Sequence, residues 1–481
     1  MLTSAIVICT LVLNIMLATF VVFRERRDIS ATWAWLLVLL FVPVVGFVLY
    51  LFFAQNLSRY RLFDSEDFNQ RDYGDIVSSQ LKKIKEGHLP YRNVDISEHR
   101  DMIYMHLLHN QAAFSDNNIF EFYTSGDKKF KQLIEDIKQA KESIHLQYYI
   151  YRRDNLGKAV REALIQKAKE GLRVRVLYDA LGSRTLNKGF FKELIKHGGE
   201  VESFFPSKLR FINIRLNYRN HRKIVVIDGK IGYIGGFNVG DEYLGLSEKF
   251  GYWRDNHLRV QGTAVYSLQA RFILDWNQAS RYHDIRYHAS LFPEPVQTGN
   301  IGAQIVTSGP DSELEHIKYG YLKMISSAKK NIYIQTPYFI PDASMLDALR
   351  VACLSDVKVH IMIPNKPDHP FVYWATLSHL GELLKLGANV YTYTNGFIHS
   401  KTIVVDGDIA SVGTANIDVR SFKLNFEVNA FLYDVGMAKH LTQQFQEDMK
   451  DSELLTLEKY EQRPRIVRFK ESVSRLLSPI L

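Results

Sequence analysis

One pattern of polar residues occurs twice in this chain, and it constrains the fold more than any other feature. The first copy, NHRKIVVIDGKIGYIGGFN, covers residues 220–238, and the second, IHSKTIVVDGDIASVGTAN, covers residues 398–416. Histidine, lysine, aspartate, glycine and asparagine recur at identical spacing in both copies. A solvated strand edge would not need five chemical positions preserved twice. The repetition therefore indicates a domain-scale duplication in which the pattern has a function.

Each copy of the pattern predicts a strand, a tight turn and a second strand. A histidine and a lysine two residues apart on a strand point to the same face. Asp228-Gly229 and Asp406-Gly407 are hairpin-turn signals between apolar runs. We therefore expect Asp228 and Asp406 to hold the geometry of the pattern rather than to contact a substrate.

The segments around the two copies predict an α/β fold. In each half an amphipathic helical pattern leads into a short apolar strand, IHLQYYI or IYIQTPYF, and a second helix and strand follow. Helices that alternate with apolar strands indicate layered α/β/α domains around mixed sheets. Because 481 residues exceed what one core can bury, we expect duplicated domains at 111–296 and 297–481.

The N-terminus predicts a transmembrane hairpin over residues 1–55. Residues 2–23 and 31–54 carry no charge, and each run is long enough to cross a bilayer as a helix. A cleaved signal peptide would have its basic residues before the apolar run, whereas here the arginines follow it. Residues 56–110 are polar and charged, and we expect a juxtamembrane linker that contains some helix.

Charge and cysteine content narrow the partners and the compartment. The formal net charge of +8 favours a partner that carries phosphates, either nucleic acid or an anionic membrane surface. Cys9 and Cys353 are the two cysteines, which leaves no disulfide framework and no multi-cysteine metal site. Arginines are balanced on the two sides of the hairpin, so the low cysteine content alone places the catalytic domains on the cytoplasmic side of the cell membrane.

The duplicated residues suit chemistry at a phosphoryl centre. Two histidines allow one to attack phosphorus while the other transfers the proton. Two lysines and two asparagine amides can stabilise charge on the non-bridging oxygens, so we expect no metal and no other cofactor. The set comprises His221, Lys223, Asn238, His399, Lys401 and Asn416. A carboxylate is needed behind each imidazole, and we predict Asp255 for His221 and Glu427 for His399.

These motifs resemble the phospholipase D superfamily. The supporting stretches are YRNHRKIVVIDGKIGYIGGFNVGDEY, GFIHSKTIVVDGDIASVGTANIDVRSFKLNFEVN, IHLQYYIY and the apolar run WAWLLVLLFVPVVGFVLYLFF. Within the superfamily the chain resembles the bacterial cardiolipin synthases, whose first motif has glycine where Gly236 stands. The resemblance implies that Asp228 and Asp406 are part of the family's catalytic motif, together with the histidines and lysines.

The resemblance implies a metal-independent phosphatidyl transfer through a phosphohistidine. Phosphatidylglycerol would be the substrate, and cardiolipin and glycerol would be the products. Anionic membrane lipids would surround the enzyme as further partners. By analogy His221 is the nucleophile and His399 the acid and base, although the pseudo-symmetry of the motifs leaves these roles reversible. Neither the oligomeric state nor an acceptor other than phosphatidylglycerol follows from the sequence.

Three other functions remain open. A phospholipase D that hydrolyses lipid would use the same residues with water as acceptor. A nucleic-acid phosphodiesterase would suit the charge but not the hairpin, and a non-catalytic membrane scaffold would not need two intact motifs.

Some further features have structural or surface interpretations. The basic and apolar runs 208–222 and 463–481 are consistent either with membrane-surface contact or with ordinary packing. We expect four histidines without partners at a recognisable spacing to be structural: His257, His360, His369 and His379.

Overall fold

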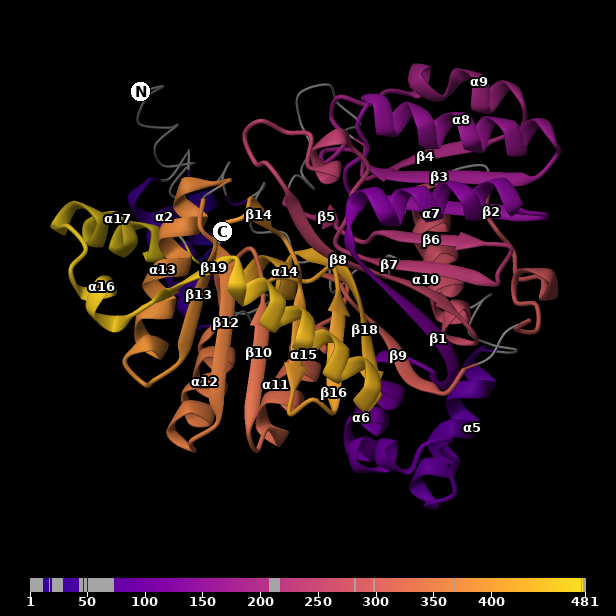
Figure 1. Ribbon diagram of the computed structural model, residues 1–481. Coiled ribbons are helices and arrows are strands. Elements are labelled where there is room, and N and C mark those ends of the chain that lie inside the picture. Colours follow the sequence, from indigo (N-terminus) through magenta and orange to yellow (C-terminus); the bar gives the residue numbers. More distant parts are fainter. Residues whose placement is uncertain are drawn as a thin grey trace, which may run out of the picture.

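The chain folds around two mixed β-sheets that stand next to each other, each with helices on its faces (Figure 1). This is a computed structural model. It describes residues 12–16, 18–19, 29–42, 46, 50, 73–206, 217–280, 283–296, 299–366, 368–476 and 478. The mixed α/β architecture agrees with the alternation of helical and strand patterns in the sequence.

The first sheet is built from residues 114–261. Its parallel part joins β4, β3 and β2, and its antiparallel part continues through β6, β7, β8 and β1. In that spatial order the strands are β4 (Glu200–Phe204), β3 (Arg173–Asp179), β2 (Ser143–Tyr148), β6 (Ile224–Ile227), β7 (Ile231–Gly235), β8 (Trp253–Gln261) and β1 (Phe114–Ser125).

The second sheet repeats this order with residues 301–455. Parallel strands β13, β12 and β10 are followed by antiparallel β15, β16, β18 and β9, and β19 is added outside β13. The strands are β19 (Ser452–Leu455), β13 (Asn389–Tyr393), β12 (Lys358–Pro364), β10 (Asn331–Gln335), β15 (Thr402–Val405), β16 (Ile409–Gly413), β18 (Asn425–Tyr433) and β9 (Ile301–Ser308).

Helices cover both faces of each sheet because alternate strand residues point to opposite sides. In the first sheet, Ile144 and Leu146 belong to a core shared with α7 and α8, whereas Leu177 lies in a separate core with α10. In the second sheet, Ile332 packs towards α11, α12 and α13, whereas Met362 packs towards α15.

The helices between the strands are bounded by capping residues of the expected kind. Asp154, Asp342 and Asp434 each accept a hydrogen bond from a backbone N–H in the first turn of the helix that follows. The main helices are α7 (Gly126–Gln139), α8 (Asn155–Lys169), α10 (Ala264–Ala279), α11 (His316–Ser327), α12 (Ala343–Leu354), α13 (Pro370–Leu384) and α15 (Val435–Lys450). Shorter helices are η3 (Lys188–Phe191), α9 (Lys192–Lys196), η4 (Asp241–Leu244), η5 (Ala289–Leu291) and α14 (Val419–Lys423).

The two halves are joined by strand pairing and by a shared apolar core. Strand β1 pairs with β8 of the first sheet and with β9 of the second. The shared core contains Val226 and Leu258 from the first half, and Val404 and Val428 from the second. The halves therefore form one continuous body, and each can contribute residues to a site between them.

Two short parallel pairings cross between the halves close to the duplicated motifs. Strand β5 (Arg219–Asn220) pairs with β18, and β14 (Phe397–Ile398) pairs with β8. A separate two-stranded pairing joins β11 (Phe339–Ile340) to β17 (Ile417–Asp418). These pairings bring the first motif against the second half of the chain, and the second motif against the first half.

Residues 73–110 are folded against the second half of the molecule. Helices α5 (Tyr73–Lys85) and α6 (Arg100–Asn110), with the turn η2 (Val94–His99) between them, bury Val77, Ile103 and Leu107 in the core of the second half. This part of the predicted juxtamembrane linker is thus a packed element of the domain.

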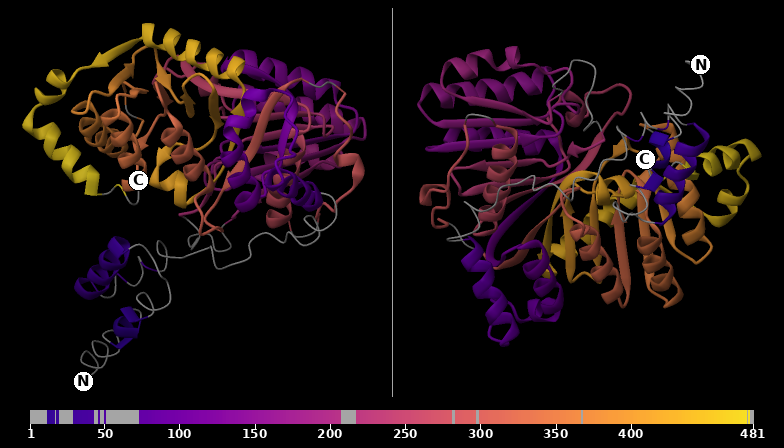
Figure 2. Two further views of the ribbon diagram at one scale, coloured as in Figure 1. Left: turned by 90° about the horizontal axis from the view of Figure 1, so that it is seen from below. Right: turned by 180° about the vertical axis from the view of Figure 1, so that it is seen from behind.

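The C-terminal segment and α2 lie on one side of the molecule. Helices α16 (Leu457–Glu461) and α17 (Arg465–Leu476) follow β19, and α17 packs along α13. Two views show α2 (Ile29–Phe41) on the side that carries α13 and α17 (Figures 1 and 2). None of the helices within the described residues combines the length and apolar character needed to cross a bilayer, and the predicted spans 2–23 and 31–54 lie only partly within those residues.

Candidate active site

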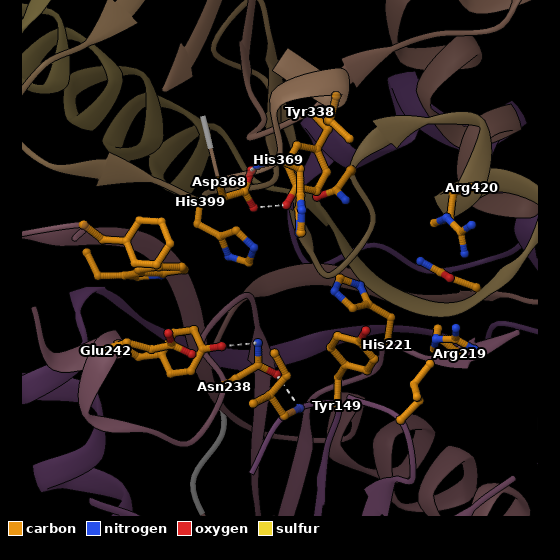
Figure 3. A pocket seen from close by; sticks show the side chains of 18 of the residues that line it. Tyr149, Arg219, His221, Asn238, Glu242, Tyr338, Asp368, His369, His399 and Arg420 are labelled. Atoms are coloured by element: carbon orange, nitrogen blue, oxygen red, sulfur yellow. Dashed lines mark hydrogen bonds between the residues drawn. The ribbon is translucent and has the colours of Figure 1, made fainter. Parts of the chain in front are cut away.

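The two motif histidines are held by strand pairings that cross between the halves. The backbone N–H of His221 donates to the carbonyl of Phe426 at 2.9 Å, and that of His399 donates to the carbonyl of Arg254 at 2.7 Å. Each histidine thus leaves a two-residue strand that is paired with a long strand of the other half. Both imidazoles point into one cavity (Figure 3).

The carboxylates behind the imidazoles are exchanged relative to the sequence prediction. His221 Nδ1 lies 2.9 Å from both carboxylate oxygens of Glu427, and His399 Nδ1 lies 2.6 Å from Asp255 Oδ2. The prediction of Asp255 for His221 and Glu427 for His399 was therefore wrong. The crossed strand pairings explain the exchange. Phe426, which binds the backbone of His221, is followed directly by Glu427, and Arg254, which binds the backbone of His399, is followed directly by Asp255.

The two carboxylates are supported differently. Thr414 Oγ1 donates to Glu427 at 2.5 Å, and Asn425 Nδ2 donates to the same carboxylate at 3.1 Å. The counterpart of Thr414 is Gly236, where an added Cβ would lie 2.0 Å from Asp255 Oδ1. Glycine at position 236 is therefore needed for Asp255 to reach its place.

Burial and charge set the ionisation of these pairs. Burial lowers the pKa of His221, and burial together with Lys401 lowers the pKa of His399 to about 4. Burial would raise the pKa of Glu427, but His221 and Lys223 lower it more, and His399 and Lys401 do the same for Asp255. Each imidazole is thus neutral and each carboxylate ionised near neutral pH.

The two lysines are buried beneath the histidines. Lys223 Nζ donates to the carbonyl of His221 at 2.6 Å, and Lys401 Nζ donates to the carbonyl of His399. Burial lowers the pKa of Lys223 to about 7 and that of Lys401 to about 8. A bound anion would stabilise both ammonium groups.

Asp228 and Asp406 lie at turns away from the cavity. Asp228 accepts hydrogen bonds from the backbone N–H groups of residues 141–143 at 2.8–2.9 Å. Asp406 accepts from those of residues 329–331 at 2.7–2.8 Å. Both aspartates have a left-handed backbone, with φ of 54° and 52°. Their contacts hold the motif hairpin against the preceding helix–strand turn, as we expected from the turn signal, and neither carboxylate lines the cavity.

The two motif asparagines line the cavity together with the histidines. Asn238 Oδ1 accepts from the backbone N–H of Ile150 at 3.0 Å, which leaves its amide nitrogen 3.4 Å from the hydroxyl of Tyr243. Asn416 Nδ2 donates to Asp418 at 3.1 Å. Both amides therefore line the cavity into which the histidines point.

The cavity has a volume of about 800 Å³ and is lined by more functional groups than the motifs contain. Tyr149 contacts the His221 ring edge-on with centroids 4.9 Å apart, and Trp253 lies 5.2 Å from the His399 ring. His369, which we expected to be structural, lies in the cavity wall beside Asp368 (Figure 3). These residues are missed by the sequence pattern because they lie outside the duplicated motifs.

The two ends of the cavity differ in charge although the motifs are equivalent. Arg219 and Arg420 lie together beside His221 (Figure 3). At the matching positions of the other half stand Phe397 and Glu242. Arg420 Nη1 and Nη2 bind the carbonyl and side-chain oxygens of Asn217 at 3.2 Å, and the charge of Arg219 contributes to lowering the pKa of Arg420, after burial. Two arginines held this close favour an anionic ligand at this end.

Comparison with known proteins finds relatives over the whole chain. Residues 133–276 and 321–449 match the family described as cardiolipin synthase, PLD-like domain, and residues 12–55 match the phospholipase D-nuclease N-terminal family. The chain is 63% identical to the major cardiolipin synthase ClsA of Bacillus subtilis, over 98% of each chain. It is 54% identical to a cardiolipin synthase of Listeria monocytogenes, over 100% of each chain.

A solved structure shows the same fold at low sequence identity. Phosphatidylserine synthase of Haemophilus influenzae aligns with a TM-score of 0.59 at 16% identity, covering 80% of this chain and 100% of the other.

Proposed function

Because the chain belongs to the cardiolipin synthase family with phospholipase-D-like domains, we propose that it joins two phosphatidylglycerol molecules into cardiolipin and releases glycerol. The observation that carries the mechanism is the pair of imidazoles in one cavity, each held at Nδ1 by a carboxylate from the other half. With Nδ1 engaged as the donor, Nε2 of each ring is left to face the substrate.

The first step places the donor lipid's phosphorus between the histidines. The neutral Nε2 of one histidine attacks phosphorus, and the bond from phosphorus to the glycerol oxygen breaks. The other histidine gives its proton to that oxygen, so glycerol leaves as a neutral alcohol. An anionic phosphodiester stabilises the imidazolium form, so substrate binding raises the pKa of the proton-donating histidine.

The second step transfers the phosphatidyl group from the histidine to the second lipid. A hydroxyl of the second phosphatidylglycerol gives its proton to the histidine that is now neutral, and its oxygen attacks phosphorus. The phosphorus–nitrogen bond breaks, cardiolipin leaves, and the first histidine returns to its neutral form. By analogy His221 is the nucleophile and His399 the acid and base.

Buried positive charge supplies the electrostatic stabilisation. Lys223 and Lys401 lie under the histidines, and Asn238 and Asn416 line the same cavity. These groups can stabilise the negative charge on the equatorial oxygens of the transition state without a metal. The arginines at the His221 end add a positive wall that favours an anionic lipid.

A phospholipase D reaction differs only in the acceptor. Water would give phosphatidic acid, so a synthase has to present a lipid hydroxyl to the phosphohistidine in a site where water is scarce. We propose that spans within residues 2–23 and 31–54 anchor the chain to the cell membrane, with the catalytic halves on the cytoplasmic side. The anchor would hold the active site at the bilayer surface, where the acceptor lipid is concentrated.

The products formed from phosphatidylglycerol vesicles test this function. The full chain should release one glycerol for each cardiolipin formed, with little phosphatidic acid. The variant His399→Ala should form neither cardiolipin nor phosphatidic acid at an appreciable rate. If phosphatidic acid were the main product, the enzyme would be a hydrolase and the proposed synthase function would be wrong.

A further inference from the structure

The last long helix, α17, carries its apolar residues on the outside. Ile466, Phe469, Val473 and Leu476 are between 38% and 81% exposed. Their spacing of three, four and three residues places them on one face of the helix. The two residues that α17 buries are Glu471 and Ser474, which are polar. This is the reverse of the pattern that a helix on a soluble surface shows.

Polar contacts fix this unusual orientation. Arg463 forms two hydrogen bonds of 2.8 Å with the buried Glu471, and Arg475 pairs with Glu382 of α13. Tyr460 fits against Gly381 of α13, where a side chain would collide with its ring. The apolar face is thus held outwards by the domain itself.

Basic groups flank the apolar face. Arg465 and Lys470 stand on either side of the exposed stripe, and Arg468 lies about one turn after Arg465. Lys470 Nζ lies 4.7 Å from the centre of the Trp374 ring of α13. An apolar stripe between cations is typical of a helix that lies in the interface of an anionic bilayer.

The same surface leads to the mouth of the active site. Helix α17 packs along α13, which begins at Pro370, directly after Asp368 and His369 in the cavity wall. Phe371 in the first turn of α13 is 51% exposed, and its neighbour Val372 lines the cavity. Helix α2, whose Phe41 is also exposed, lies on this side of the molecule (Figure 2).

We propose that the outer face of α17, together with Phe371, is a docking surface for an anionic phospholipid bilayer. Phe469 and Leu476 enter the acyl-chain boundary, while Arg465 and Lys470 contact the lipid phosphates. The catalytic cavity then opens at the level of the head groups, so that lipid reaches it without leaving the bilayer. The proposal deepens the proposed function, because it says how a lipid substrate is delivered.

A spin label on the full chain tests the docking directly, without using activity. Two labelled proteins are prepared, both with Cys9 and Cys353 replaced by serine. One carries the label at position Phe469 and the other at the control position Leu354. Leu354 is 73% exposed and ends α12, which lies away from α17 (Figure 1). In vesicles containing phosphatidylglycerol we expect the label at 469 to be accessible to oxygen and shielded from a water-soluble nickel chelate. The label at 354 should be accessible to the chelate.

Two results would overturn the proposal. One is a label at 469 that stays as accessible to the chelate as the control. The other is shielding without lipid that increases with protein concentration, which would show that a second copy of the chain covers the face.

Activity on two forms of substrate gives a second test. Phe469→Asp with Leu476→Asp should lower the rate on phosphatidylglycerol vesicles by about tenfold or more. The rate on a monomeric, short-chain phosphatidylglycerol should not change, and Leu354→Asp should alter neither rate. An equal loss on both substrates would mean that the helix only stabilises the fold, and no loss would mean that the face does not dock.

Charge variants test the anionic part of the surface. Arg465→Gln with Lys470→Gln should weaken vesicle-dependent activity by about fivefold per residue at low salt, and less at high salt. Should the enzyme hydrolyse rather than transfer, the products would change but the label at 469 would still be shielded. Failure of the function and failure of the docking surface are thus separable.

Discussion

Glu427 binds the imidazole of His221 with both carboxylate oxygens 2.9 Å from Nδ1, although the two residues are 206 positions apart. The reciprocal contact joins Asp255 to His399 across 144 positions. Neither half can therefore complete its own catalytic pair. The two histidine–carboxylate pairs form only when the two halves of the chain are assembled against each other.

This crossed arrangement predicts which histidine each carboxylate controls. Glu427→Gln should lower the pKa of His221 and leave that of His399 nearly unchanged, and Asp255→Asn should do the opposite, because each ionised carboxylate stabilises only the imidazolium it contacts. Nitrogen NMR of labelled histidine would measure both. Turnover should fall by ~10²–10⁴ in each variant with little change in Tm. A Glu427→Gln variant that alters His399 instead would refute the pairing.

The buried lysines predict a loss of anion affinity at alkaline pH. Burial holds the pKa of Lys223 at about 7 and that of Lys401 at about 8, so both ammonium groups lose their charge as pH rises through this range. Sulfate keeps a constant charge there, so its inhibition constant as a competitor reports the protein alone. We expect sulfate to bind more weakly at about pH 9 than at about pH 6. A constant inhibition constant would show that the lysines are not the anion-binding groups.

Removal of metal should leave the chemistry intact. In the proposed mechanism Lys223 and Lys401 supply the positive charge that a metal cation would otherwise provide, so a chelator should change turnover by less than about twofold at fixed ionic strength. Complete loss of activity, restored by one particular metal, would contradict this account of the site.

Asp228 should be important for stability and not for chemistry. Its carboxylate accepts three backbone N–H groups, so Asp228→Asn should lower the free energy of unfolding by about 1–3 kcal/mol while turnover per folded molecule is kept. Asp356→Asn is a matched control, because Asp356 also has a left-handed backbone but its carboxylate is exposed and pairs with Lys358. Denaturant unfolding and active-site titration would separate the two effects. Normal stability with lost turnover would make Asp228 catalytic.

Much of the fold and of the motif could be predicted from the sequence, because both follow local rules. Strand–turn–strand hairpins, alternating helices and strands, and the position of Asp228 in a turn all depend on residues close in sequence. The choice of carboxylate could not be predicted, because His221 and Glu427 meet through a two-residue strand pairing between halves. His369 and Arg420 were also missed, since they reach the cavity only through tertiary packing and lie outside the repeated pattern.

The packing of residues 73–110 shows a similar limit. Their polar composition indicated a linker, yet α5 and α6 bury a few well-spaced apolar residues such as Ile84 and Leu107. Helix α17 shows a related limit, because the mixture of basic and apolar residues in 463–481 left membrane-surface contact and ordinary packing open, and did not reveal that the apolar side of the helix faces outwards.

The most direct test of the account is to trap the covalent intermediate. His399→Asn should slow both steps, because His399 protonates the leaving glycerol in the first and accepts the acceptor's proton in the second. With phosphatidylglycerol that carries radiolabelled phosphorus, we expect His221 still to attack at a reduced rate and the adduct to accumulate because the second step is slowed more. We predict a base-stable, acid-labile adduct on the peptide that contains His221, and none in His221→Ala. Label on His399 in the wild-type chain would reverse the two roles, and the absence of any phosphohistidine during turnover would contradict the mechanism.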